Sequence, residues 1–523
     1  MSTATDTPPR RRIGVGHDHA NYKWWALSCT SLGMLLVATN SGTLIIALPE
    51  LERSLHTSLL ELVWVILVYM IASTVLVLTA GRLSDLFGRK KAYVLGFLAF
   101  SLASLGAGFS ADGVALIVWR VLQGVGGAFL FANSAAIVTD AFPREQLGLA
   151  MGTNTMVAAI GLVVGPVLGG ALVSISWPWV FWFNVPLGII GSVWGQLILR
   201  ELTGRAQDRR WDMLGTVTFT LGLTGLVYGL SKGGLSGWGG APVLVGLALA
   251  VVCLPLFVVV ERHHPAPMLD LSIFRSRLFA TASAAAFFNG LARFALMFLF
   301  VFYFQGAQSD DPILAGIKLA PLAVGMLIAS PLAGIWADRH GSRTLAAVGM
   351  LVTAVGLAAM TTLAQHTSFV WAALWLVVVG LGSGMFNSPN TAAMMGAVPV
   401  HRRGIAAGAR VLLQNTGAVI SIAFVIAIVT ASVPRDVLFK IFSGLAQGLS
   451  SQKVDSFIAS MHSALWVLAA VSLVGAGISL LRPKLVQIPS ETMDPAQAGA
   501  GGSGPAGTSS APARPATAAG SVR

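Results

Sequence analysis

Two short charged segments interrupt a chain in which only 10% of the residues are charged. The sequence GRLSDLFGRKK occupies residues 81–91, GIWADRHGSR occupies 334–343, and each lies between two long apolar runs. Asp85 can cap a helix N-terminus or pair with a neighbouring arginine, and Gly88 permits a turn with positive φ. The chemistry available to these residue types at this spacing is helix packing, turn formation and ion pairing, not bond making.

The spacing of the two segments shows that the chain repeats itself. Gly81, Asp85 and Gly88 recur 253 residues later as Gly334, Asp338 and Gly341. A second pair, AFPREQLGLAMG (141–152) and AVPVHRRGIAAG (397–408), recurs at an offset of 256 residues. Two matches in register indicate parallel repeats, and repeats of this kind are typical of transporters with a pathway between two halves.

The apolar runs between these segments predict a polytopic membrane protein. The chain is 55% hydrophobic with a mean hydropathy of +0.77, and its apolar runs have the length of about 20 residues that crosses a bilayer as a helix. We expect an all-α fold with fourteen transmembrane helices, arranged as six, two and six. The predicted spans are 24–48, 62–80, 92–110, 114–139, 148–174, 179–199, 213–231, 241–260, 278–305, 313–336, 344–364, 369–396, 404–432 and 462–481.

The basic residues then predict an orientation. With the N-terminus inside, 24 of the 33 Lys and Arg residues fall in inside segments, five in outside loops and four within spans. This asymmetry follows the positive-inside rule. It places both termini in the cytoplasm of a multi-pass plasma-membrane protein, and it accounts for the net charge of +12 without nucleic acid.

These spans divide the chain into five parts. A cytoplasmic arm precedes the first six-helix bundle, a linker with two extra transmembrane helices follows it, and a second six-helix bundle leads to a tail rich in Ala, Gly, Pro and Ser that should be disordered. The predicted boundaries are 1–23, 24–200, 201–277, 278–484 and 485–523.

An enzyme is not expected. His263 and His264 are adjacent, which is not a metal-ligand spacing, and Cys29 and Cys253 lie in separate apolar runs. The chain has no G-x-x-x-x-G-K-[ST] phosphate loop, so we expect no hydrolysis of ATP. We therefore expect no metal and no cofactor, and transport would have to be secondary.

Three motifs together resemble the major facilitator superfamily, in its fourteen-span drug:proton antiporter branch. The segment at 81–91 resembles the family's loop between spans two and three. LIVWRVLQGVGGA (116–128) resembles its fourth-span motif, at Arg120, Gln123 and Gly124. The fifth-span antiporter pattern is the most specific of the three, and its residues are Gly152, Gly161, Gly165, Pro166, Gly169 and Gly170.

The resemblance implies a monomeric exporter of small amphipathic molecules that works by alternating access in exchange for protons. The charged loops would form a cytoplasmic gate, with Asp85 and Arg89 pairing with Asp140 at the end of the fourth span. The residues that the resemblance assigns to this gate are Gly81, Asp85, Gly88, Arg89, Asp140, Gly334, Asp338, Gly341 and Arg343.

The sequence also departs from the family. Asn40 stands where many relatives carry an aspartate, and none of the 21 acidic residues lies within a predicted span. The proton carrier would then be Asp140 on the inside or Glu61 on the outside. Arg293 lies nearest to mid-span, and a charge there usually faces a cavity or a partner; a positive field favours anionic, zwitterionic or polar neutral substrates. The predicted cavity residues are Asn40, Asn154, Asn289, Arg293, Asn387, Gln414 and Asn415.

Three functions stay open. The first is a proton-driven exporter of drugs or secondary metabolites, which the fifth-span motif favours. The second is a translocator of lipids or anionic metabolites without proton coupling, which Asn40 and the acid-free spans favour. The third is a membrane sensor or scaffold that binds a ligand without moving it.

Overall fold

The structure is a computed structural model, and it describes residues 21–143, 146–201, 212–265, 267–398, 403–434, 437, 440–441 and 451–483. These residues belong to one compact unit that ends at Pro483. Most of the predicted N-terminal arm (1–23) and the whole predicted tail (485–523) lie outside the described residues.

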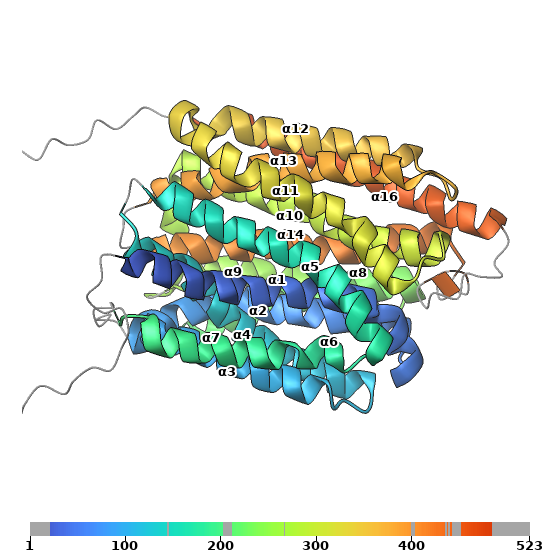
Figure 1. The fold of residues 1–523 in the computed structure, drawn as a ribbon, viewed down its shortest axis with the longest axis horizontal. Coiled ribbons are helices and arrows are strands. Elements are labelled where there is room, and N and C mark those ends of the chain that lie inside the picture. Colours follow the sequence, from blue (N-terminus) through green and yellow to red (C-terminus); the bar gives the residue numbers. More distant parts are fainter. Residues whose placement is uncertain are drawn as a thin grey trace, which may run out of the picture. The chain divides into compact units, whose positions relative to one another are not determined.

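Every regular element in the described residues is helical (Figure 1). The first part of the chain forms α1 (Tyr22–Leu55), α2 (Leu59–Phe87), α3 (Arg89–Ala107), α4 (Gly113–Ala141), α5 (Leu147–Ile175), α6 (Trp179–Trp182) and α7 (Asn184–Ile198). The linker forms α8 (Met213–Ser236) and α9 (Ala241–His263). The last part forms η2 (Leu271–Arg275), α10 (Arg277–Phe302), η3 (Tyr303–Ala307), α11 (Pro312–His340), α12 (Ser342–Ala359), η4 (Met360–Thr362), α13 (Phe369–Gly396), α14 (Arg403–Ser432) and α16 (Ser451–Leu480).

Twelve helices among the described residues are long and apolar enough to cross a membrane, with α6 and α7 counted as one continuous span. They match twelve of the fourteen predicted spans. The helices α3 and α5 occupy the other two predicted positions and are not among these twelve; of α5, the stretch Val164–Ile175 is found as a shorter apolar helix in the described residues. The count of fourteen membrane spans therefore stays a prediction.

Acidic residues at the ends of the spans cap helices. Backbone N–H groups of Ala115, Gly215 and Leu314 donate to the carboxylates of Asp112, Asp212 and Asp311 at 2.7–2.9 Å. The first N–H groups of a helix have no partner within it, so a carboxylate at this position satisfies one donor and faces the positive end of the helix dipole. Capping explains why acids collect where spans begin.

A single glycine forms each of the two predicted turns. Gly88 separates α2 from α3 and has φ 106°, and Gly341 separates α11 from α12 and has φ 85°. Both values lie in the region that glycine reaches without steric cost, which confirms the positive φ predicted for Gly88. The end of the unit that carries these turns is called the motif end below, and the end where α10 leads to α11 is called the opposite end.

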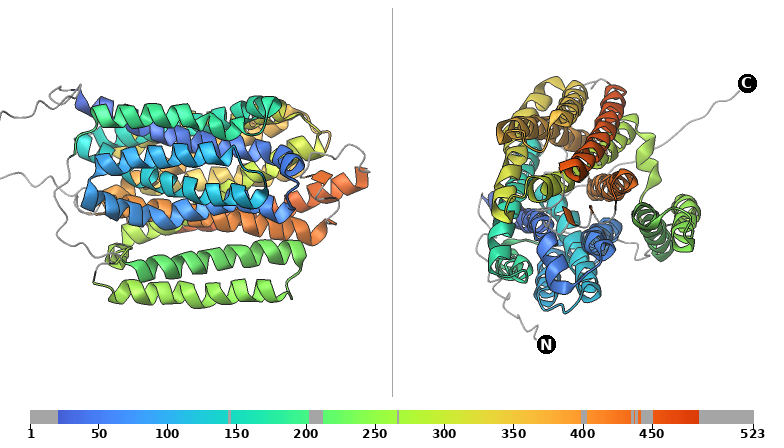
Figure 2. Two further views of the ribbon diagram at one scale, coloured as in Figure 1. Left: turned by 90° about the horizontal axis from the view of Figure 1, so that it is seen from below. Right: turned by 90° about the vertical axis from the view of Figure 1, so that its right-hand side faces the viewer.

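The helices before and after the linker meet along two seams. Within the first part, α1 packs on α4, α5 and α7, and α4 packs on α2 and α3; within the last part, α10 packs on α14 and α16, and α13 packs on α11 and α12. The seams between these parts, called the N half and the C half below, are α5 against α11 and α2 against α14. The pair α8 and α9, green in Figure 2, lies side by side at the edge and packs through α8 on α14 and α2.

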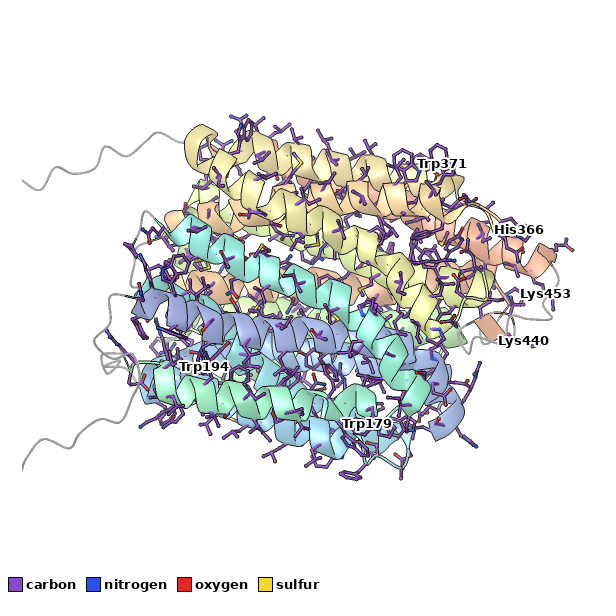
Figure 3. The ribbon with its side chains drawn as sticks, in the orientation of Figure 1. Trp179, Trp194, His366, Trp371, Lys440 and Lys453 are labelled. Carbon is purple, nitrogen blue, oxygen red and sulfur yellow. The ribbon has the colours of Figure 1, made fainter. Side chains whose placement is uncertain are left out.

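Two of the exposed tryptophans, Trp179 and Trp371, lie near helix ends (Figure 3). Trp179 and Trp371 are 44% and 56% exposed, and they lie at the opposite-end termini of α6 and α13. In Figure 3, His366, Lys440 and Lys453 gather at the same end. Amphipathic rings and cations at helix ends are typical of the membrane–water interface.

The glycines of the fifth-span motif bring α5 into close contact with α1 and α11. A Cβ added to Gly161, Gly165 or Gly169 would lie 2.7–2.9 Å from atoms of Ala38, Gly42 or Thr43 on α1. On the other side of α5, a Cβ on Gly170 would lie 2.7 Å from the Ile313 Cα on α11. Small residues allow such approach between membrane helices, where dispersion contacts and not hydrophobicity hold helices together.

Gly152 does not take part in this packing, because no atom lies within 4 Å of the position where its Cβ would stand. The motif therefore has four glycines that face neighbouring helices, a proline that removes one hydrogen bond within α5, and a first glycine that faces open space.

The packing predicts that Gly165→Val destabilises the unit by about 1–3 kcal/mol, because the added methyl groups must displace α1 from α5. Thermal unfolding of the detergent-purified protein measures this change. Gly152→Val is the matched control and should unfold within a few degrees of the wild type. An equal loss of stability in the two variants would contradict the packing role.

Candidate functional site

The predicted gate loop contains an ion pair at the motif end. The guanidinium of Arg89, the first residue of α3, pairs with the carboxylate of Asp140 near the end of α4. Gly81 lies close to α4, because a Cβ added to Gly81 would lie 3.8 Å from the Ala132 Cβ. The structure thus ties the loop to the fourth span, as the resemblance implied for Arg89 and Asp140. The side chain of Asp85, the third member of that predicted contact, lies outside the described residues.

The repeat of this loop in the C half is described in part. A Cβ at Gly334 would lie 2.9 Å from the Ser388 Oγ on α13, so α11 and α13 approach closely there. Arg343 is half-buried in the first turn of α12, and the side chain of Asp338 lies outside the described residues. The gate role of these residues stays a prediction.

The fourth-span residues form a buried network that joins five helices of the N half. Arg120 of α4 donates from Nε to the Val65 carbonyl of α2 at 3.0 Å and from Nη1 to the Gln123 Oε1. The Gln123 Nε2 donates to the Ser104 Oγ of α3 at 2.7 Å and to the Asn40 Oδ1 of α1 at 3.1 Å. Asn184 of α7 donates to the same Asn40 oxygen at 3.3 Å.

This network explains why these polar side chains lie within spans. Arg120 and Gln123 are 1% and 0% exposed, and the guanidinium of Arg120 stacks over the Tyr69 ring at 4.2 Å. In lipid every polar group needs an internal partner, so the network fixes the mutual positions of α1, α2, α3, α4 and α7. A Cβ on Gly124 would lie 2.7 Å from the Ala72 Cβ, which brings α4 close to α2 beside the network.

A cavity lies between the two halves. It has about 1190 Å³ of empty volume, including space open to solvent, and its described lining comes from α1, α4, α5, α10, α11, α13 and α14. The lining residues of α4, α5, α13 and α14 all belong to the motif-end halves of these helices. At the opposite end, Gly316 and Ile313 of α11 close against Pro166 and Gly170 of α5. The cavity is therefore displaced toward the motif end.

Five of the seven predicted cavity residues line this space: Asn154, Arg293, Asn387, Gln414 and Asn415. Asn40 and Asn289 are not among its lining residues. Asn40 is 1% exposed in the N-half network, and Asn289 is 0% exposed within α10. A helix that is surrounded by other helices carries polar side chains on several faces. The position of a residue along such a helix therefore does not determine whether its side chain faces the cavity.

The two predicted proton carriers lie away from the cavity lining. Asp140 is paired with Arg89 at the motif end. Glu61 forms a capping box with Ser58 at the start of α2: the Ser58 N–H donates to Glu61 Oε2 at 2.8 Å, and the Glu61 N–H donates to Ser58 Oγ at 3.3 Å. Each acid therefore has a structural role where it stands.

Sequence reasoning missed several lining residues. Arg410, which is not among the predicted cavity residues, lines the cavity and donates to Gln414 Oε1 at 2.9 Å. Its spacing of four residues from Gln414 places both on one helix face, a signal that could have found it. The apolar part of the lining, which no motif indicated, includes Met34, Phe131, Met151, Phe294, Met326 and Met395.

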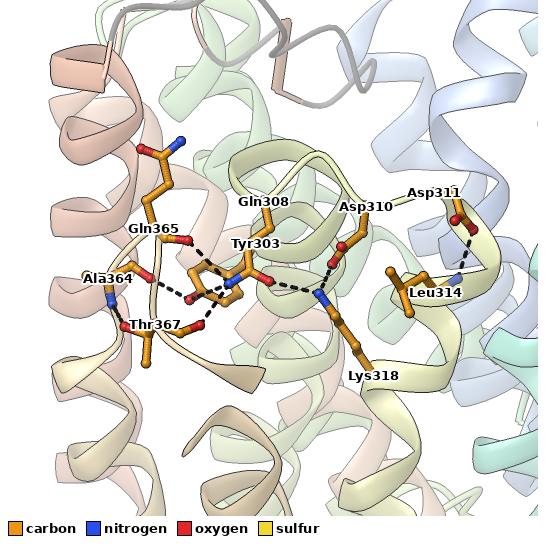
Figure 4. A network of polar contacts seen from close by, with 9 residues as sticks. All are labelled: Tyr303, Gln308, Asp310, Asp311, Leu314, Lys318, Ala364, Gln365 and Thr367. Carbon is orange, nitrogen blue, oxygen red and sulfur yellow. Dashed lines mark hydrogen bonds and ion pairs between the residues drawn. The ribbon is translucent and has the colours of Figure 1, made fainter. Parts of the chain in front are cut away.

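A second polar network closes the opposite end of the C half (Figure 4). Lys318 of α11 donates to Asp310 Oδ2 at 2.5 Å and to Gln308 Oε1 at 3.1 Å. Gln308 also donates to the Tyr303 hydroxyl at 3.1 Å, and that hydroxyl donates to the Ala364 carbonyl at 2.7 Å. Lys318 is thus neutralised near the end of its span. The cations among the described lining residues of the cavity are Arg293 and Arg410.

The described part of the chain holds no group of three or more His, Cys, Asp and Glu side chains placed to bind a metal.

The buried network predicts a large effect for Gln123→Leu. The substitution removes the acceptor of Arg120 and one donor to Asn40, so the unit should lose about 2–3 kcal/mol of stability. Thermal unfolding in detergent tests this, with the exposed Gln452→Leu on α16 as the matched control. Equal unfolding temperatures for the two variants would show that the network does not hold the N half together.

Comparison with known proteins now places the chain. Residues 30–422 match the family model described as the Major Facilitator Superfamily. The chain is 31% identical over 422 residues to the tetracenomycin C resistance and export protein of Streptomyces glaucescens, covering 80% of this chain and 78% of that protein. It is 32% identical over 409 residues to the puromycin resistance protein of Streptomyces alboniger, covering 77% and 80% of the two chains.

A third relative and a solved structure agree with this placement. The multidrug resistance protein Stp of Mycobacterium tuberculosis is 31% identical over 400 residues, which cover 76% of this chain and 74% of that protein. The crystal structure of the human organic anion transporter MFSD10 covers 87% of this chain and 99% of its own with a TM-score of 0.60, and its 13% identity supports the fold alone. The chain belongs to the Major Facilitator Superfamily, a family of membrane transporters.

Proposed function

We propose that this protein exports small amphipathic molecules by alternating access, in exchange for protons. The observation that carries the proposal is the cavity between the halves, which is displaced toward the motif end while α5 and α11 close the opposite end. A binding site between two repeats that is closed on one side is what alternating access requires. The positive-inside pattern makes the motif end cytoplasmic, in a monomer of the plasma membrane with both termini inside.

The substrate class rests on the relatives and on the cavity. Two of the relatives are named for tetracenomycin C and puromycin, and a third is named as a multidrug resistance protein. The cavity combines amide and cationic groups with methionine and phenylalanine side chains. Such a lining fits molecules with a polar part and an apolar part, because methionine adapts its shape to different ligands.

The proposal includes coupling of transport to protons, which requires a residue that carries the proton. The described lining of the cavity contains no acid, so we assign the carrier role to Asp140, with Glu61 second. Protonation of Asp140 would remove the charge that holds Arg89 and thereby loosen the gate loop from α4. The proton would then act on the gate, not on the substrate.

A second function has a specific observation in its favour. Among the described lining residues of the cavity, the charged groups are two arginines, and a translocator of lipids or anionic metabolites needs no titrating acid in the pathway. This alternative predicts substrate movement without proton movement. A sensor or scaffold, the third function, predicts binding with no movement at all.

Liposomes that contain the purified protein and a pH-sensitive dye separate these functions. A pH gradient is imposed, and cationic, neutral and anionic compounds are added in turn. Substrate-dependent proton movement is the expected result. Flux of substrate without proton movement would contradict coupling and favour the translocator, and binding without flux would contradict transport.

Alternating access also predicts that a cross-link at the motif end stops transport. A Cβ at Gly408 of α14 would lie 3.9 Å from the Leu78 Cα and 3.7 Å from the Leu78 Cγ on α2, so cysteines at the two positions would bring their Cβ atoms near the separation of about 3.5–4.5 Å that a disulfide needs. Leu78→Cys combined with Gly408→Cys should therefore lose nearly all flux under oxidising conditions and regain it after reduction.

The single variants, treated with the same oxidant, are the controls for this cross-link. They should keep their flux, since Cys29 and Cys253 are buried. Full flux through the cross-linked double variant would show that α2 and α14 need not separate during transport.

A further inference from the structure

The two walls of the cavity differ in charge. The C half contributes Arg293, Arg410, Asn387, Gln414 and Asn415 to the lining. The N half contributes no charged side chain among the described lining residues. Its amide, Asn154, donates to the Ser134 hydroxyl at 2.8 Å, and its Oδ1 is an acceptor without a hydrogen-bond partner among the described residues. The positive charge of the cavity therefore lies on one side.

Arg293 is buried and only partly satisfied. It is 9% exposed, and its Nε has no hydrogen-bond partner among the described residues. Its Nη1 has only the Met326 sulfur, at 3.8 Å, and its guanidinium stacks on the Phe294 ring at 4.7 Å. A guanidinium has five N–H donors, so most of the donor capacity of this side chain is unused.

Arg410 is positioned by neighbours that carry no charge. Its Nη1 donates to Gln414 Oε1 at 2.9 Å, and Gln414 Nε2 donates to Asn387 Oδ1 at 3.1 Å. This chain of hydrogen bonds links α14 to α13 and orients the guanidinium without neutralising it. The other donors of Arg410 stay available to a ligand in the same cavity.

No described residue of the lining is acidic, so the two arginines have no counter-ion in the cavity. An unpaired cation is costly within a membrane, and such a charge usually marks a pathway or a ligand site. Lys318, at the opposite end of the C half, differs from these two arginines because it has an ion-pair partner, Asp310.

We propose that Arg293 and Arg410 form the recognition site for the oxyanion of an amphipathic substrate, such as a carboxylate, phosphate or sulfonate. The inference rests on the proposed transport function and names the substrate class. Planar guanidinium groups bind such oxyanions in a bidentate way, and the bonds are strong where water is excluded. A cation would meet two positive charges and no acid, so this chain selects against the lipophilic cations that an acidic cavity would accept.

The wall of the cavity that the N half forms fits the apolar body of such a substrate. Met34 of α1, Phe131 of α4 and Met151 of α5 face the cavity from the N half. A molecule with its oxyanion at α10 and α14 would place its rings or chains against these side chains. Its contacts would then span both halves, which is how a substrate can favour one arrangement of the halves over another.

Two dyes that share one aromatic body test the inference. Anilinonaphthalene sulfonate carries an anion, and phenylnaphthylamine has the same rings without it. Binding to the purified full chain in lipid nanodiscs is measured by equilibrium dialysis, with binding to empty nanodiscs subtracted. The wild type should bind the sulfonate at least about tenfold more tightly than the neutral dye.

The variants Arg293→Gln and Arg410→Gln should each weaken binding of the sulfonate about tenfold and change binding of the neutral dye less than about twofold. Arg293→Lys keeps the charge but loses the planar fork, so it should retain more of the preference than Arg293→Gln and less than the wild type. Arg262→Gln removes an exposed cation from α9, outside the cavity, and is the matched control that should behave as the wild type.

Equal affinity of the wild type for the two dyes, or an equal loss of both in the arginine variants, would overturn the inference. Thermal unfolding in the same nanodiscs shows whether a variant has folded. If a variant has not folded, the comparison of the two dyes on the wild type still tests the inference. Flux of both dyes in proteoliposomes without preference for the sulfonate would contradict the inference and support transport. Selective binding of the sulfonate with no flux of either dye would contradict transport and support the anion site.

Discussion

The close approach of α5 to α1 and α11 is the constraint on which the rest of the structure depends. In a bilayer, contact between helices gains nothing from excluding water, so shape and hydrogen bonds must hold the bundle together. Gly161, Gly165 and Gly169 let α5 lie against the backbone of α1, and Gly170 lets it lie against α11. Because this seam closes the two halves at the opposite end, the space left between them lies toward the motif end, where the cavity is found.

The two halves repeat the same turns but use polar residues differently. In the N half, Arg120, Gln123 and Asn40 satisfy one another within a network that joins five helices. In the C half, Arg293 and Arg410 line the cavity, and the Arg293 Nε has no hydrogen-bond partner among the described residues. A rigid polar network beside a wall with unsatisfied cations suits a carrier, because one half can serve as a fixed frame while the other offers the charge that holds the substrate.

The sequence predicted the helices well, since the described structure places a helix at every predicted span, and it also predicted the turn at Gly88. It predicted the candidate site only in part. Asn40 and Asn289 face other helices, and Arg410 faces the cavity. Arg482, one residue beyond the last predicted span, is 1% exposed and donates to Asn390. A helix that is apolar all round has no periodic signal to show its orientation about its axis, so only tertiary packing decides which side chains meet.

The most direct test of alternating access measures distances at both ends of one protein. Spin labels on Lys91 and Thr344 report the separation of the halves at the motif end, and labels on Ala111 and Thr362 report it at the opposite end; all four residues are exposed. Alternating access predicts two populations in nanodiscs: the distance between the labels at one end is long whenever the distance at the other end is short. Adding substrate or changing pH should shift the balance between the two populations. A single, unchanging distance at both ends under all these conditions would contradict it.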